Sequence, residues 1–287
     1  MAGWARFELS RFQRKGVDNL IRVTEKGVTF LQFRHLAACP EINHGIFTRN
    51  SGRSKPPYNS LNVGNGIGDD DKLVEENRRI VAQCIRGRQL VFAEQVHGRR
   101  VLIIGRQDDA GAEHRNPAQF IGDAMVTDIA EKFLVIQVAD CQAVLLYEPV
   151  RHVIANVHCG WRGSIGNIIG HTVDIMKRHF GCSPDSIRAG IGPSLGPCCA
   201  EFIHYETEIP AEFWRYKDAG NHFDFWSISR AQLMRAGVPE ENLESSQICT
   251  RCHGDDFFSY RAEKTTGRFA AVIGLKAKAV GGDSDGT

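Results

Sequence analysis

The amino-acid sequence predicts one domain of the α+β class, with mixed and largely antiparallel β-sheets flanked by helices. Strand-like runs outnumber the helical stretches, and several of them follow one another through short connections. This order favours substantial antiparallel sheet over a regular βαβ winding. Between residues 42 and 275 we find neither a Pro- or Ser-rich linker nor an internal repeat, which favours a single domain in a chain of 287 residues.

The two ends of the chain differ from this central part. Residues 1–40 are interpreted as an N-terminal extension that could form a β-hairpin, because two short strand-like runs meet at Glu25-Lys26-Gly27. Residues 277–287 are mostly small and polar, and we expect them to form a disordered tail. The main domain is therefore placed at residues 41–276.

Three stretches carry helical signals. Asp69, Asp70 and Asp71 can cap a helix that runs to about residue 85 and carries an apolar stripe. A second helix is predicted from about residue 164 to residue 180, where Gly181 stops it. A third helix is predicted over roughly residues 229–236.

Seven apolar runs between and after these helices are predicted to be strands, because they are short and rich in β-branched or aromatic residues. They cover residues 90–96, 101–104, 133–138, 144–147, 153–157, 187–191 and 269–275.

Composition limits where the protein works and what it binds. Lys and Arg number 35 against 34 Asp and Glu, so no overall field draws the chain to nucleic acid or to an anionic membrane. Charged residues interrupt the N-terminal segment, so it does not resemble a secretory signal, and no apolar run approaches the ~20 residues of a membrane span. We expect a soluble cytoplasmic protein whose nine cysteines are thiols.

Three predicted strands end in residues that can bind a metal. His97 lies in EQVHG, Cys141 in VADCQ and His158 in NVHCGWRG, each where an apolar run gives way to a glycine or polar turn. One thiolate and two imidazoles are a typical ligand set of catalytic zinc, which keeps the fourth position open. Taken singly, each residue is more often packed in a core than a ligand, and the spacing does not decide between these interpretations.

A longer series of motifs adds to this evidence. HGIFTRNSG, YNSLNVG, GDD, ENRR, EQVHG, GDAMVTD, VADC, VHCGWRG, IGPSLGPCC and FFSYRAEKTTGR follow one another between about residues 44 and 275. In this order they resemble the YfiH-like family, also described as laccase-domain proteins, multicopper polyphenol oxidases, peptidoglycan editing factors and purine nucleoside phosphorylases. The resemblance implies a fold similar to that of cytotoxic necrotising factor.

The resemblance also implies a site and an activity. The family's zinc ligands fall on His97, Cys141 and His158, which would make residues 41–276 the catalytic domain. The implied reactions are phosphorolysis of adenosine, inosine, guanosine or methylthioadenosine and deamination of adenosine, with purine nucleosides and phosphate as partners. The enzyme would thus be both a transferase and a hydrolase, while its oligomeric state is left open.

The chain departs from the family pattern beside two of these ligands. Cys159 stands where the family usually has Ala, and Gln142-Ala143 stands where Pro commonly follows the ADC motif. Since the ligands themselves are intact, we expect these differences to affect the shape of the substrate pocket more than the metal.

Further residues are candidates for supporting roles. Arg49 in FTRNSG and Arg162 in GWRG are catalytic candidates, since a guanidinium fork can bind phosphate or a purine carbonyl, although a structural ion pair explains each equally well. Asn62 could bind substrate or stabilise a turn. Asp140 could orient a ligand imidazole, yet strand alternation would point it away from Cys141. Gly160 is expected to serve a tight turn.

Other functions compete for the same residues. Cys141 as nucleophile and His158 as base would form a cysteine-type hydrolase or amidase, which suits the editing of peptidoglycan precursors. A copper-dependent polyphenol oxidase is disfavoured, because the 11 histidines include no HxH pair, and copper at this site would be adventitious. A non-catalytic protein with structural zinc is a third alternative. His97 discriminates between the first two, since only a metal site needs it.

Two pairs of cysteines, Cys249 with Cys252 and Cys198 with Cys199, could also bind a metal or a cofactor. Cys249-Thr250-Arg251-Cys252-His253 matches the CxxCH pattern of covalent haem attachment, but haem is not expected without export. A zinc knuckle built on this motif would need two more ligands, so a turn or a pair of packed thiols is preferred. Cys198-Cys199 is interpreted as two small buried residues rather than as ligands.

Overall fold

The computed structural model describes residues 20–107 and 120–277 and contains two six-stranded sheets. The first has the strand order β1-β2-β3-β12-β7-β4 and the second β11-β10-β8-β9-β6-β5. The strands are β1 Leu20–Glu25, β2 Val28–Phe33, β3 Ile42–Phe47, β4 Gln89–Phe92, β5 Val101–Ile103, β6 Ala124–Thr127, β7 Lys132–Val138, β8 Gln142–Glu148, β9 Val153–Cys159, β10 Arg188–Ile191, β11 Leu243–Ser245 and β12 Phe269–Leu275.

The helices are mostly short and lie outside the sheets. They are α2 Arg34–Ala37, α3 Asp71–Ile85, α4 Trp161–Ile165, α5 Ile168–Phe180, α6 Tyr205–Glu208, α7 Phe225–Arg235 and α8 Tyr260–Glu263, with 3-10 turns at η3 Pro184–Ser186, η4 Ala211–Tyr216 and η5 Glu240–Asn242.

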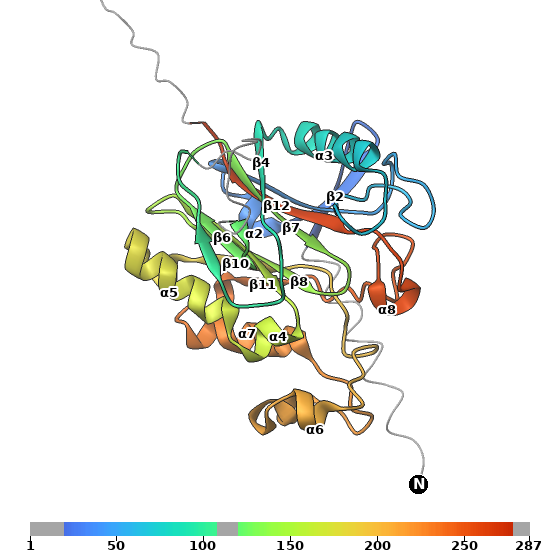
Figure 1. The fold of residues 1–287 in the computed structure, drawn as a ribbon. Coiled ribbons are helices and arrows are strands. Elements are labelled where there is room, and N and C mark those ends of the chain that lie inside the picture. The colour runs from blue at the N-terminus through green and yellow to red at the C-terminus, as the bar shows by residue number, and fades with distance from the viewer. Residues whose placement is uncertain (1–19, 108–119, 278–287) are drawn as a thin grey trace, which may run out of the picture.

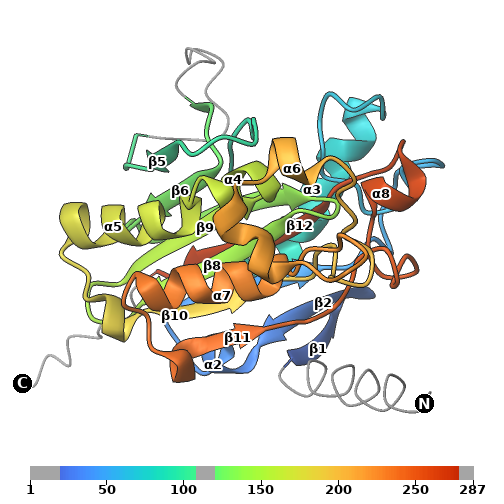
Figure 2. The same ribbon diagram turned by 90° about the horizontal axis from the view of Figure 1, so that it is seen from below.

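The two sheets pack face to face and helices cover their outer faces (Figures 1 and 2). Side chains of β7 and β12 meet those of β8 and β9 in the central core, where Leu134, Ile136 and Leu145 are fully buried. α3 packs on the outer face of the first sheet, while α5 and α7 lie on the outer face of the second. Each sheet therefore buries both faces, which explains why its strands are apolar runs rather than alternating patterns.

The expected fold class is confirmed. β4, β5 and β11 pair in parallel with a neighbour, and every other strand pairing is antiparallel. All seven predicted strands are present, and β3, β6 and β11 are additional. The predicted strand over 90–96 is too long, because β4 ends at Phe92 and the segment that carries His97 leaves the sheet.

Helices are present where the sequence predicts them, but some of them begin or end at other residues than predicted. Asp70 caps α3 by accepting a hydrogen bond from the backbone N–H of Lys72. The predicted helix over 164–180 is two helices, since the chain breaks at Asn167, which has a φ of 53° and caps α5. Gly181 ends α5 in the left-handed conformation, as expected from the sequence. α7 begins four residues before the predicted start at residue 229.

The N-terminal strands belong to the first sheet. β1 and β2 pair across Lys26-Gly27 as an antiparallel hairpin, and β2 also pairs with β3. The first 19 residues and nearly all of the predicted tail lie outside the described residues, so the domain boundaries at residues 40 and 276 stay predictions. None of the helices in the described part is long and apolar enough to cross a membrane.

Candidate metal centre

His97, Cys141 and His158 converge at one end of the two sheets. His97 comes from the loop after β4, Cys141 immediately precedes β8, and His158 lies in β9 opposite Ala143 of β8. One potential ligand atom from each residue lies within 4.8 Å of the others. The His158 side chain is buried, Cys141 is partly buried and His97 is exposed, so the group is open to solvent on the His97 side.

Asp123 holds both histidines in place. Its Oδ1 accepts hydrogen bonds from His158 Nδ1 and from the backbone N–H of His97, both at 2.8 Å, and its Oδ2 accepts one from the backbone N–H of Gly98 at 2.7 Å. His97 has a φ of 58°, and Asp123 stabilises this left-handed conformation. Because a carboxylate accepts from Nδ1, the lone pair of the neutral His158 ring lies on Nε2, where a metal can replace the proton of the imidazolium.

The electrostatics of the group favour a thiolate beside an imidazolium when no metal is bound. Burial opposes ionisation of Cys141, but attraction to His158 and hydrogen bonds from both histidines outweigh it and lower the thiol pKa to about 6. Burial likewise opposes the charge on His158, yet the Cys141 charge and the Asp123 hydrogen bond raise its pKa to about 9. The site therefore carries a deprotonated sulfur near neutral pH, as metal binding requires.

Gly160 lies against all three donors. A Cβ atom at this position would meet Cys141 Sγ and His97 Cδ2 at 3.1 Å each and His158 Cε1 at 3.9 Å. The φ of Gly160 is −73°, a value that any residue can adopt. The close approach to the donors, and not the backbone conformation of a tight turn, therefore favours glycine here, which corrects the expectation from the sequence.

A cavity of about 780 Å³ opens over the donors. Cationic side chains on its wall outnumber carboxylates, with Arg78, Arg162, Arg261, Lys264 and Arg268 against Glu94 and Asp140. Five aromatic residues also line it: Phe92, Trp161, Phe202, Phe225 and Tyr260. Guanidinium groups bind phosphate, and aromatic side chains stack on flat rings. The wall therefore suits ligands that bring a phosphate group and a flat ring into the cavity.

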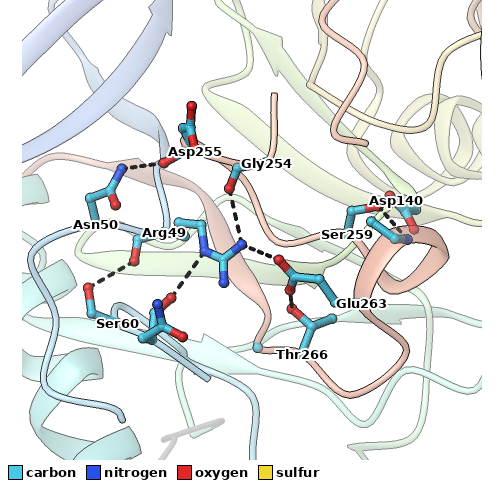
Figure 3. Close-up of polar contacts among 12 residues, drawn as sticks. Arg49, Asn50, Ser60, Asp140, Gly254, Asp255, Ser259, Glu263 and Thr266 are labelled. Atoms are coloured by element: carbon cyan, nitrogen blue, oxygen red, sulfur yellow. Dashed lines mark hydrogen bonds and ion pairs between the residues drawn. The ribbon is translucent and has the colours of Figure 1, made fainter. Parts of the chain in front are cut away.

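The two arginines singled out in the sequence lie in different places. Arg162 is exposed, lines this cavity and packs over the Trp161 ring at 4.3 Å. Arg49 is not among the residues that line it. The Arg49 side chain donates to Asn59 O at 3.1 Å, to Gly254 O at 3.0 Å and to Glu263 Oε1 at 2.6 Å (Figure 3).

Arg49 therefore joins the loop that carries it to the segment before and within α8. Its guanidinium also packs over Phe258 at 4.4 Å, and only 8% of the residue is exposed. We expect Arg49→Lys to lower the free energy of unfolding by about 1–3 kcal/mol. A lysine ammonium group cannot reach all the acceptors that the guanidinium group binds, so buried acceptors are left unpaired. The metal content should not change.

Urea unfolding and elemental analysis would test this, with Arg79→Lys on the exposed face of α3 as the matched control. Unchanged stability together with weaker binding of inorganic phosphate would instead support a role of Arg49 in binding an anionic ligand.

Asp140 and Asn62 stabilise loops around the cavity. Asp140 accepts hydrogen bonds from Thr250 Oγ1 at 2.6 Å and Ser259 Oγ at 2.7 Å, so its carboxylate is held by the segment between β11 and α8 (Figure 3). Asp123, in the GDAM motif, makes the contact to a ligand imidazole that was expected of Asp140. Asn62 is fully buried and binds Asp69 and the backbone of Gly64.

Cys159 and Gln142, which depart from the family pattern, are buried residues next to His158 and Cys141 in the sequence. Cys159 lies 3.2 Å from Ser164 Oγ, and burial raises its thiol pKa to about 12. Gln142 is buried and accepts a hydrogen bond from Ser229 of α7. Neither residue is one of the three donors, but both line the cavity, where they can affect its shape.

Comparison with known proteins identifies the family of the chain. The family model described as multi-copper polyphenol oxidoreductase laccase matches residues 43–276. The chain belongs to this family. Among relatives in the laccase-domain family, purine nucleoside phosphorylase YlmD of Geobacillus stearothermophilus is 34% identical over 81% of this chain and 89% of its own length. Purine nucleoside phosphorylase YfiH of Escherichia coli is 32% identical over 85% and 96%.

Solved structures of the family share the fold. The crystal structure of YlmD from Geobacillus stearothermophilus superposes with a TM-score of 0.79 at 32% identity and covers 90% of this chain and 100% of that one. The structure of Bacillus licheniformis YfiH gives a TM-score of 0.78 at 31% identity, over 86% and 96%. The resemblance identified from the motifs is therefore confirmed.

Proposed function

We propose that this chain is a zinc-dependent purine nucleoside enzyme that cleaves nucleosides with phosphate and deaminates adenosine. The observation that carries the proposal is the convergence of His97, Cys141 and His158 on the wall of a cavity rich in cations and aromatic rings. The name purine nucleoside phosphorylase, carried by both relatives described above, supports phosphorolysis as the main reaction. Candidate substrates are adenosine, inosine, guanosine and methylthioadenosine.

The three donors fit zinc in number and kind. One thiolate and two imidazoles suit its borderline character, and three protein ligands leave one tetrahedral position for substrate or water. The exposed side of His97 is where that position can open into the cavity. Asp123 supplies the carboxylate that commonly supports a zinc-binding histidine.

The side chains around the donors can position both reactants. In phosphorolysis, a phosphate oxygen bonds to C1′ of the ribose while the bond from C1′ to the purine nitrogen breaks. Arg162, Arg268 and Lys264 are the cations we assign to phosphate, and Trp161 and Tyr260 are candidates to stack on the purine. The contribution of a bound zinc ion is Lewis-acid polarisation of an oxygen atom on phosphate or water. In deamination, water adds at C6 of adenosine and ammonia leaves.

A second candidate function is a cysteine-type hydrolase or amidase that edits peptidoglycan precursors. The observation that favours it is the chain of contacts from Cys141 through His158 to Asp123, which resembles a nucleophile, a base and an orienting carboxylate. This arrangement makes no use of the His97 imidazole. The position of His97 at hydrogen-bond range of Cys141 therefore favours the metal enzyme.

The metal-binding residues of the described part of the chain do not favour a copper oxidase. The described residues contain two clusters of three or more potential metal ligands, and only the one with His97 and His158 includes histidine. A laccase needs many grouped imidazoles in addition to a His and Cys site. Copper bound at His97, Cys141 and His158 would in our proposal be adventitious.

We place the enzyme in the cytoplasm. All nine cysteines are free thiols, and Cys198 and Cys252 are exposed. Thiols persist in this form in a reducing compartment.

Chelation separates the two candidate functions. A zinc enzyme loses nucleoside turnover when stripped of metal and regains it with Zn²⁺, whereas a thiolate nucleophile is indifferent to chelators and forms an acyl-enzyme. We expect stripped protein and the His97→Ala variant to be inactive on nucleosides, and no acyl adduct on Cys141 to accumulate with a peptidoglycan precursor peptide. Undiminished turnover without metal, or a Cys141 adduct found by mass spectrometry, would favour the hydrolase.

A further inference from the structure

Four cysteines that the proposed function does not use lie together on another part of the surface. Cys198 and Cys199 belong to the loop between β10 and α6, and Cys249 and Cys252 to the segment between β11 and α8. All four sulfur atoms lie within 4.8 Å of one another. Cys199 and Cys249 are buried, whereas Cys198 and Cys252 are exposed, so the cluster lies at the rim of the protein.

The sulfur spacing is that of a metal site and not of a disulfide. Cys252 Sγ is 3.6 Å from Cys198 Sγ and 3.6 Å from Cys199 Sγ. A disulfide would hold two sulfurs at about 2.05 Å. The corners of a zinc tetrahedron lie about 3.8 Å apart, because each Zn–S bond is about 2.3 Å long.

Backbone contacts hold the two loops in this arrangement. Ser194 donates to Ile248 O at 3.1 Å, and Thr250 donates back to Ser194 O at 3.0 Å. The backbone N–H groups of Gly196 and Cys252 donate to the Cys249 sulfur and so help to fix its position. Arg261 donates to the carbonyl of Cys199 at 3.3 Å and brings a positive charge close to the cluster. The cluster is thus built from two paired loops.

We propose that Cys198, Cys199, Cys249 and Cys252 bind a second zinc ion, which is structural. Four thiolates fill the tetrahedral coordination of zinc and leave no position for substrate, in contrast to the three-donor site. The proposal assigns the CxxC motif at Cys249 to metal binding and supplies the two further ligands that a zinc knuckle needs. The expectation that Cys198-Cys199 is a buried apolar pair is wrong, since Cys198 is exposed.

The ion would brace the wall of the substrate cavity. Thr250, next to Cys249, donates to Asp140 Oδ1, and Asp140 directly precedes Cys141. Leu195 donates its backbone N–H to Asp140 O at 2.8 Å and lines the cavity with Ser194 and Arg261. Joining the two loops therefore limits the movement of the cavity wall, an effect that rests on the proposed function although the metal site itself does not.

The test uses the full chain with the first site removed. The double variant His97→Ala/His158→Ala should, when purified with Zn²⁺ and a thiol reductant, retain one zinc ion per chain, and X-ray absorption should show four sulfur neighbours at about 2.3 Å. Adding Cys249→Ser/Cys252→Ser should remove this zinc. Cys84→Ser and Cys182→Ser, at buried cysteines outside both clusters, are matched controls that should keep it.

The unaltered protein provides a second measurement should the variants fail to fold. It should hold about two zinc ions per chain, with an average coordination shell rich in sulfur. Absence of zinc from the four-cysteine cluster, iron in its place, or a disulfide among these residues found by non-reducing peptide mapping would overturn the proposal. Loss of nucleoside turnover does not enter this test, so the two proposals fail separately.

Discussion

Replacing His97, Cys141 or His158 singly by Ala is expected to remove the zinc ion of the three-donor site, about one per chain, and with it nucleoside turnover. A site with three protein ligands tolerates no loss, because two donors rarely hold zinc against its hydration. Elemental analysis of each purified variant, combined with a turnover assay, checks the result. His171→Ala, at an exposed histidine on α5, is the matched control and should keep both metal and activity.

The three variants should differ in stability even though all lose the metal. His158 is 3% exposed and its partner Asp123 is fully buried, so His158→Ala leaves a buried carboxylate with one donor fewer. Removing one partner of such a buried pair lowers the free energy of unfolding by about 3–5 kcal/mol. Because the His97 side chain is exposed, His97→Ala should lower the free energy of unfolding much less than His158→Ala. Full zinc retention in two of the three variants would show that these residues are not the ligands.

Asp123→Asn is expected to weaken zinc binding about 10- to 100-fold, although Asp123 touches no metal in this proposal. An amide offers one oxygen where the carboxylate offers two. It cannot accept from His97, Gly98 and His158 together, so at least one of these donors loses its acceptor. The same loss should lower the free energy of unfolding by about 1–3 kcal/mol. Competition titration against a chelator measures the affinity, and urea unfolding measures the stability.

Glu148→Gln is the matched control for this variant. Glu148 is fully buried and also accepts two backbone hydrogen bonds, from Val150 and Arg151, far from the donors. It should lose stability and keep its zinc affinity. Equal zinc affinity in Asp123→Asn and the unaltered protein would mean that Asp123 does not orient His158 toward a metal.

Elements whose signals lie within a few residues could be predicted from the sequence. Asp70 precedes an apolar stripe, so the start of α3 follows from a cap, and Gly181 ends α5 because glycine adopts the left-handed conformation without strain. The apolar runs predicted the central strands, since both faces of each sheet are covered and the strands need no polar face.

Boundaries set by distant partners could not be predicted in this way. The apolar pattern across residues 164–180 favours one helix, yet Gln232 of α7 donates to the carbonyl of Ser164, and the chain turns at Asn167. The run that includes EQV reads as strand, but Asp123 takes the backbone N–H groups of His97 and Gly98 that a strand would use for pairing.

For the sites, the amino-acid sequence specifies which residue types are present, and the order of its motifs indicates the family and the candidate ligands. Which of these residues come into contact follows from the folded chain. It placed Asp123 and not Asp140 beside His158, enclosed Arg49 among backbone carbonyls, and joined Cys198-Cys199 to Cys249 and Cys252. The physical reason is that hydrogen bonding and metal binding depend on distances of a few ångströms between atoms, which sequence separation does not express when the loops lie on different strands.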